Sequence, residues 1–114
     1  MKIDILGTEY DYELTTEHED TRLCGCDGYC DAYEKRIAIE NGHNKNAPGS
    51  IANFDSLYQK VKRHEIIHAY LFESGLQDYA GNEQLVDWIA WRFPKLLKTF
   101  EEVGAIQGGD VCKQ

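Results

Sequence analysis

The chain has 114 residues, enough for one domain with a single hydrophobic core, and we expect residues 104–114 to form a loose tail of that domain. Asp and Glu number 20 against 12 Lys and Arg, so the formal net charge is -8. A negative charge of this size repels phosphate backbones and anionic lipid surfaces, so we expect neither nucleic acid nor a membrane as a direct partner.

The first 15 residues predict a β-hairpin. Residues 2–6 alternate apolar and polar side chains, Gly7-Thr8 marks a turn, and residues 9–15 alternate acids with aromatic or aliphatic side chains. Asp4 interrupts the apolar run at the start, which is too short for the roughly 7 to 15 apolar residues of a secretory signal. No apolar run reaches the roughly 18 residues of a membrane span. We therefore expect a cytoplasmic protein.

A polar segment that contains glycine follows over residues 16–31 and holds three of the four cysteines, Cys24, Cys26 and Cys30. The fourth is Cys112, in the expected tail. We favour reduced thiols, because no export signal points to an oxidising compartment. A structural metal site with four thiolate ligands and disulfide bonds are the alternatives, although the spacing is not the paired CxxC of familiar zinc sites.

The run KRIAIE at residues 35–40 alternates polar and apolar side chains and predicts a third strand, which ends at Asn41-Gly42. Residues 42–53 contain a Pro-Gly pair and predict a loop. From Asp55 the apolar spacing becomes helical and continues to Phe72, with a stop at Gly75.

This helix carries the sequence HEIIH at residues 64–68, a pattern that composition alone would produce in about one such chain in a hundred. Histidines four residues apart differ by about 40° in azimuth, so His64 and His68 can bind one metal ion. Glu65 lies about 100° around the helix and can act on a metal-bound water as general base without binding the metal. The pattern predicts the zinc site of a metallopeptidase; two helix histidines without a metal are the alternative.

A second helix is predicted from Asn82, a good N-cap, to Gly104, and its aromatic and aliphatic side chains are assigned to the core. Pro94 lies inside this helix. Because proline lacks a backbone donor and clashes with the preceding turn, we expect the helix to kink or restart there. Residues 76–81 are too few and too polar to predict an element.

A catalytic zinc ion takes three protein ligands and leaves one position open for water. The best third ligand is Glu83, which follows His68 by 15 residues, enough for a loop and an antiparallel return. Asp87 lies one turn further on the same face, where a carboxylate can accept the ring N–H of a zinc-bound histidine. Glu73 and Asp78 are rival ligands, but Glu73 shares the helix of the histidines and points away from them.

HEIIH together with Glu83 and Asp87 resembles the glutamate zincins, the thermolysin-like metallopeptidases, whose second motif is a glutamate ligand with an aspartate four residues later. The short chain, and the string from Glu83 through Ala90 to Pro94, looks closer to the small intracellular metallopeptidases of phages and mobile elements, the ImmA and IrrE relatives. The resemblance covers about residues 29–97. It implies one catalytic Zn²⁺ ion, a protein or peptide substrate, and a bacterial or phage-infected cell.

The resemblance also implies a mechanism, in which Glu65 deprotonates a zinc-bound water and later passes the proton to the leaving amine. In such families a strand before the active helix can pair with an extended substrate, and residues 35–40 occupy that place. A tyrosine or histidine commonly holds the oxyanion. The candidates for that role are the tyrosines Tyr70, Tyr79, Tyr29 and Tyr33.

We therefore expect an α+β fold of the minimal zincin type, with a small, mostly antiparallel sheet of about three strands packed on the HEIIH helix and a second long helix. The expected function is zinc-dependent hydrolysis of peptide bonds in an intracellular protein. The alternatives are a phage or mobile-element interaction protein with a structural zinc centre, and a metal-free binding domain. Substrate identity and oligomeric state do not follow from the sequence.

Overall fold

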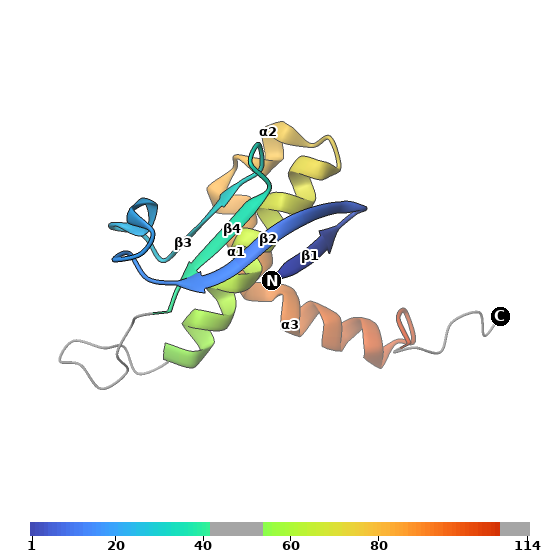
Figure 1. The fold of residues 1–114 in the computed structure, drawn as a ribbon. Helices are drawn as coiled ribbons and strands as arrows, with labels where there is room; N and C mark the ends of the chain where they lie inside the picture. The colour runs from blue at the N-terminus through green and yellow to red at the C-terminus, as the bar shows by residue number, and fades with distance from the viewer. Residues whose placement is uncertain (42–53, 108–114) are drawn as a thin grey trace.

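A mixed four-stranded sheet forms one layer of the fold (Figure 1). The computed structural model describes residues 1–41 and 54–107. The strands lie in the order β1-β2-β4-β3; β1 pairs with β2 and β3 with β4 in antiparallel fashion, whereas β2 and β4 run parallel. Their bounds are β1 (Lys2–Ile5), β2 (Thr8–Thr15), β3 (Gly28–Asp31) and β4 (Arg36–Glu40).

The expected α+β class and the predicted hairpin over the first 15 residues are confirmed. Leu6 and Gly7, with φ of 50° and 89°, form the two-residue turn between β1 and β2. Left-handed backbone at both positions matches the twist of a hairpin. The fourth strand, β3, lies in a segment for which the sequence predicted no element. It has little apolar pattern of its own and forms a strand by pairing with β4.

Three helices follow the sheet: α1 (Phe54–Glu73), α2 (Gln77–Ala80) and α3 (Glu83–Glu102). A short 3-10 turn, Thr21–Leu23, precedes β3. The two predicted long helices are confirmed. The prediction that residues 76–81 hold no element was wrong, since four of them form the single turn of α2. In the described part of the chain, none of the helices has the length and apolar character needed to cross a membrane.

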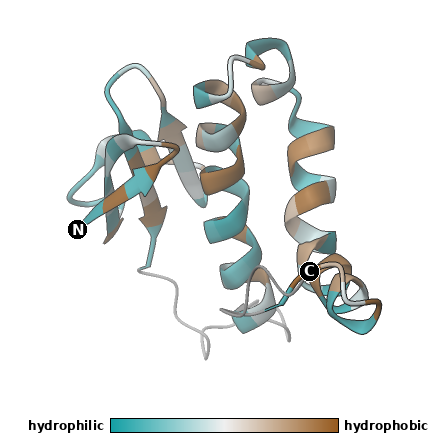
Figure 2. Ribbon diagram, turned by 90° about the vertical axis from the view of Figure 1, so that its right-hand side faces the viewer, coloured by the Kyte–Doolittle hydropathy of each residue, from teal (hydrophilic) through white to brown (hydrophobic). Residues whose placement is uncertain are grey.

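The predicted loop over residues 42–53 lies outside the described residues, as do residues 108–114 of the predicted tail. Figure 2 shows α1 lying between the sheet and α3, so that the fold has three layers. The main core lies between the sheet and α1. Its buried members are Ile5, Tyr10, Ile37, Ile39, Val61 and Ala69.

A polar cluster around Glu73, the last residue of α1, joins this helix to the sheet. The Glu73 carboxylate accepts hydrogen bonds from the hydroxyl of buried Tyr10 at 2.7 Å, from Lys35 Nζ at 2.7 Å and from Thr8 Oγ1 at 3.2 Å. The hydrogen bond from Lys35, then that from Tyr10, lowers the pKa of Glu73. Burial, and after it the hydrogen bond to the same carboxylate, raises the pKa of Tyr10. The cluster therefore stabilises the fold more strongly while Glu73 is ionised.

We expect Glu73→Gln to lower the free energy of unfolding by about 1 to 2 kcal/mol near neutral pH. Because the folded-state pKa is depressed, the stabilisation is present above the ordinary pKa of a glutamate and is lost as the pH falls through the lower folded-state value. Urea unfolding as a function of pH measures this. The difference between wild type and variant should shrink in acid, and exposed Glu9→Gln is the control; a constant difference would contradict the assignment.

Pro94 lies inside α3, which continues through it to Glu102. Proline removes the hydrogen bond that the Ala90 carbonyl would otherwise accept from residue 94. Arg63 Nε on α1 donates to that carbonyl instead, at 2.7 Å. Figures 1 and 2 show that the axis of α3 turns along its length, which agrees with a proline kink. The sequence predicted a kink or a restart at Pro94, and α3 is kinked. Arg63 of α1 supplies the hydrogen-bond donor that Pro94 lacks.

This exchange of donors can be tested by a double-mutant cycle. Arg63→Met leaves the Ala90 carbonyl without its side-chain donor and should cost about 1 to 3 kcal/mol of stability. Pro94→Ala restores the backbone N–H of residue 94. We therefore expect Pro94→Ala to recover most of the loss in the Arg63→Met background, as measured by denaturant unfolding. Strict additivity of the two changes would refute the exchange.

Candidate metal centre

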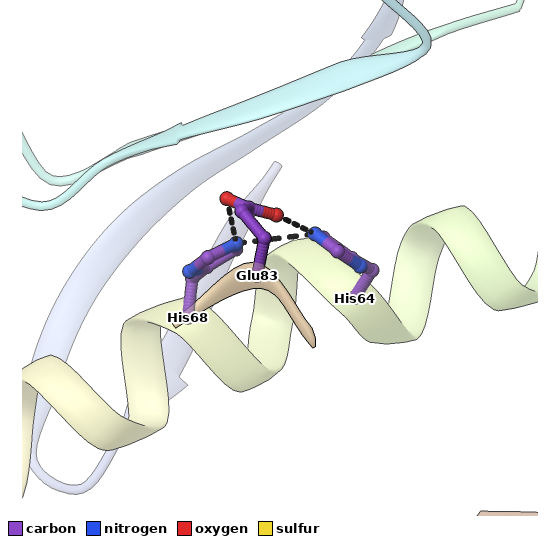
Figure 3. Close-up of side chains that lie close together, drawn as sticks. All are labelled: His64, His68 and Glu83. Atoms are coloured by element: carbon purple, nitrogen blue, oxygen red, sulfur yellow. Dashed lines mark hydrogen bonds and ion pairs between the residues drawn. The ribbon is translucent and has the colours of Figure 1, made fainter. Parts of the chain in front are cut away.

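His64 and His68 of α1 and Glu83 of α3 point their side chains at one another (Figure 3). Glu83 Oε1 lies 2.9 Å from His64 Nε2, and Glu83 Oε2 lies 3.0 Å from His68 Nε2. The two Nε2 atoms are 3.1 Å apart. The structure thus brings together the three residues that the sequence selected as metal ligands.

The donor set and its spacing fit a zinc ion. Two imidazole nitrogens and one carboxylate oxygen form the ligand set of a catalytic zinc site with one open position. Ligands at about 2.0 to 2.1 Å from a tetrahedral ion lie about 3.3 Å from each other. The ligand atoms of His64, His68 and Glu83 all fall within 4.8 Å of one another, and the three closest separations need to open by only a few tenths of an ångström.

The position of Glu83 depends on the way α3 begins. Asn82 caps the helix, since its side chain accepts a hydrogen bond from the Leu85 backbone N–H at 3.0 Å. Glu83 is then the first helical residue and lies opposite the two histidines. The rival Glu73 is held by Tyr10 and Lys35. The other rival, Asp78, is in α2 and is not a member of the ligand group that the described residues form.

The second nitrogen of each histidine is also engaged. Asp87 Oδ1 lies 3.0 Å from His64 Nδ1, and the Ala80 carbonyl oxygen lies 2.5 Å from His68 Nδ1. Each acceptor favours the tautomer with hydrogen on Nδ1, which leaves Nε2 free to bind a metal. The sequence indicated the role of Asp87. It did not indicate that of Ala80, because a backbone carbonyl acts here and α2 was not predicted.

Lys60 is a further residue of the site that sequence reasoning missed. Its Nζ atom lies 2.7 Å from Asp87 Oδ1 and 5.3 Å from the ring centre of Trp91. Partial burial raises the pKa of Asp87, but Lys60, with a smaller contribution from His64, outweighs burial and lowers it overall. Asp87 therefore stays ionised as an acceptor. Lys60 precedes His64 by one helical turn, and that spacing was the signal in the sequence.

Glu65 lies on the side of α1 that faces the sheet, and it is 7% exposed. A Cβ atom added to Gly28 of β3 would lie 3.3 Å from Glu65 Cγ and 3.0 Å from the Ala38 carbonyl oxygen. Glycine at position 28 therefore leaves room for the Glu65 side chain. Burial raises the pKa of Glu65, and the charges of His64 and His68 oppose this effect. The structure thus holds a buried carboxylate beside the ligand group.

A pocket of about 460 Å³ opens next to His68. β3 and the turn after it form one side of the pocket, and the end of α1 with α2 forms the other. Tyr33 and Phe72 contribute aromatic rings whose centroids lie 5.3 Å apart, edge to face. A separate pocket of about 510 Å³ is lined by residues such as Thr16, Cys26 and Glu40, none of which belongs to the ligand group. The smaller pocket is the one that adjoins the site.

Strand β4 does not have the free edge expected for the substrate-pairing strand at residues 35–40. It pairs with β2 on one side and with β3 on the other. That expectation was therefore wrong. The edge position next to the pocket belongs to β3, whose residues Cys30 and Asp31 contribute to the pocket lining.

The four tyrosine candidates differ in their surroundings. The Tyr29 hydroxyl donates to Asp20 Oδ2 at 2.6 Å and accepts from Arg36 Nε at 2.9 Å, so it belongs to a network on the sheet. Tyr33 lines the pocket, and Tyr70 and Tyr79 are exposed. Tyr79 precedes Ala80, whose carbonyl contacts His68. In the described part of the chain, none of the four hydroxyls hydrogen-bonds to His64, His68 or Glu83.

Cys24, Cys26 and Cys30 form no disulfide within the described residues. The three do not form a metal-ligand group within the described residues, and Cys112 lies outside them. Burial raises the pKa of the Cys30 thiol to about 12. Thiolate ligands held by these three cysteines and disulfides between them are therefore not part of the described structure.

Comparisons with protein-family models, with curated proteins and with solved structures find no match to this chain.

We expect the purified protein to bind one Zn²⁺ ion per chain. His64→Ala and His68→Ala should each abolish binding, and Asp87→Asn should weaken it about 10- to 100-fold, because the amide is a poorer acceptor for the His64 ring N–H. Competition with a fluorescent chelator measures the affinity. Exposed Glu102→Gln should bind like wild type; unchanged affinity in Asp87→Asn would argue against its orienting role.

Proposed function

We propose that the protein is a zinc-dependent endopeptidase of the glutamate zincin type. The observation that carries this proposal is the convergence of His64, His68 and Glu83, with the buried Glu65 on the next position of the same helix. Two imidazoles, one carboxylate ligand and an independent carboxylate are a set of groups with which a metal site can hydrolyse an amide. The HEIIH motif with Glu83 and Asp87, and its resemblance to that family, support the same reading.

His64, His68 and Glu83 would hold the ion, which supplies a Lewis acid for the scissile carbonyl and for water when it is bound. Glu65 takes a proton from the attacking water and returns it to the nitrogen of the leaving amine. Asp87 and the Ala80 carbonyl keep the two imidazoles in one orientation through these steps. Lys60 keeps Asp87 anionic.

The substrate in this proposal is a peptide segment in extended conformation. Among the described strands, β3 has a neighbour on one side only, so its other edge can add a peptide strand. The pocket next to His68 would accept a side chain of that peptide. Phe72 and Ala80 in its lining favour an apolar side chain, and the resemblance points to a protein substrate in the cytoplasm of a bacterial or phage-infected cell.

The substitution Glu65→Gln tests the enzyme directly. Glutamine keeps the shape of the side chain but cannot accept the proton, so we expect at least a 100-fold loss of peptide cleavage with Zn²⁺ binding retained. Cleavage of a peptide library, followed by mass spectrometry, is the measurement, and Glu9→Gln is the matched surface control. Cleavage that persists in Glu65→Gln would exclude this mechanism.

The runner-up is an interaction protein whose zinc centre is structural. The observation in its favour is the large exposed apolar surface of α3, which includes Trp88 and Phe93. On that reading, removal of zinc by a chelator would unfold the protein, wild type would cleave no peptide, and Glu65→Gln would change nothing.

A further inference from the structure

The segment between the 3-10 turn Thr21–Leu23 and β3 carries two cysteines at the surface. Cys24 and Cys26 are both exposed, and a single glycine, Gly25, separates them. Neither belongs to a metal-ligand group of the described residues. Two accessible thiols so close in the chain can form a disulfide if the backbone holds their Cα atoms about 4.4 to 6.8 Å apart.

The backbone of this segment forms a type II β-turn. Cys24 has φ of -60° and ψ of 119°, and Gly25 has φ of 79°. These are the values of the two central residues of a type II turn, in which the second central residue is commonly glycine. The Cys26 backbone N–H donates to the Leu23 carbonyl oxygen at 3.0 Å, which is the hydrogen bond that closes such a turn.

The turn sets the separation of the two cysteines. In an extended chain, Cα atoms two residues apart are separated by about 6.6 to 7.2 Å, which is at or beyond the limit for a disulfide. A left-handed residue between them bends the chain as a helical residue does and shortens this distance to about 5.5 Å. Gly25 therefore places Cys24 and Cys26 within disulfide range while both are still thiols.

Contacts with the sheet hold the turn in place. Leu23 is fully buried. Asp20 accepts a hydrogen bond from the Arg22 backbone N–H at 3.1 Å and another from the hydroxyl of Tyr29 on β3 at 2.6 Å. Because these contacts already order the backbone, closing a bond across the turn costs little further conformational entropy.

The two thiols differ from the third described cysteine in accessibility and acidity. A pocket of about 510 Å³ adjoins Gly25 and Cys26, so a small molecule can reach the turn. Burial raises the pKa of Cys30 to about 12, which leaves that thiol protonated and unreactive. Burial also raises the pKa of Cys26. We therefore expect Cys24 to react first.

We propose that Cys24 and Cys26 form a redox site that exchanges between dithiol and disulfide by reaction with small disulfides such as oxidised glutathione. The Cys24 thiolate attacks one sulfur of the small disulfide, forms a mixed disulfide and releases one thiol. The Cys26 thiolate then attacks Cys24 Sγ and releases the second thiol. The two cysteines give up two electrons and two protons, and the small disulfide takes them up as two thiols. This site is independent of the proposed peptidase activity.

Equilibration of the folded protein with glutathione buffers of increasing oxidised fraction tests the site. Acid quenching, alkylation of the remaining thiols and mass spectrometry identify the products. Wild type, and a variant with Cys30→Ala and Cys112→Ser, should both form the bond between Cys24 and Cys26 without retaining glutathione. Cys26→Ser lacks the second thiol and should accumulate the mixed disulfide of Cys24 with glutathione.

Two substitutions of Gly25 test the role of the turn. A Cβ atom at this position would have no neighbour within 4 Å, so alanine and asparagine both fit. Asparagine tolerates the left-handed conformation, whereas alanine favours others. The reduced turn can relax to those conformations and the closed ring cannot. We therefore expect Gly25→Ala to lower the equilibrium constant for disulfide formation about 5-fold, and Gly25→Asn to stay within about twofold of wild type.

Any of three results would overturn the proposal. Both cysteines could carry glutathione at equilibrium with no bond between them. The bond could form only after unfolding in urea, which would mean that the folded turn keeps the thiols apart. Finally, Gly25→Ala could match wild type and Gly25→Asn, which would show that the turn does not determine the exchange.

Discussion

The arrangement of α1 between two layers determines most of what this protein can do. Successive residues of a helix lie about 100° apart, so Glu65 and its neighbour His64 face different directions. In this fold both directions are covered, since Glu65 faces the sheet at Gly28 and His64 faces the start of α3. A helix covered on one side only would leave either the carboxylate or the imidazoles in open solvent. The three-layer order thus converts the local pattern HEIIH into a site.

Two polar groups of α1 and α3 find their hydrogen-bond partners in a neighbouring layer and so join the layers. The Ala90 carbonyl, deprived of its helical donor by Pro94, accepts from Arg63 and so links α3 to α1. The Glu73 carboxylate at the end of α1 links this helix to β2 through Tyr10. Both contacts lie near the ligand group in sequence but do not belong to it. The Arg63 contact holds α3 against α1, the pair of helices that carries Glu83 and the histidines, and the Glu73 contact holds α1 against the sheet.

Local pattern was sufficient for the parts of this protein that depend on neighbours in the chain. The hairpin, both long helices, the Asn82 cap and the residues of the ligand group could all be predicted, because turn chemistry and helical spacing act over a few residues. The spacing between His68 and Glu83 allowed a return of the chain but did not require it.

Tertiary structure decided the rest. Strand β3 has little apolar pattern and exists through its pairing with β4, which also takes away the free edge expected for β4. The roles of Lys60 and of the Ala80 carbonyl depend on which groups α3 and α2 bring next to α1. The apolar residues of α3 were assigned to the core because helical periodicity predicts an apolar stripe but does not show which element, if any, packs against it. Both helices have 20 residues, and only the offset between α1 and α3 in the fold shows where that stripe leaves the core.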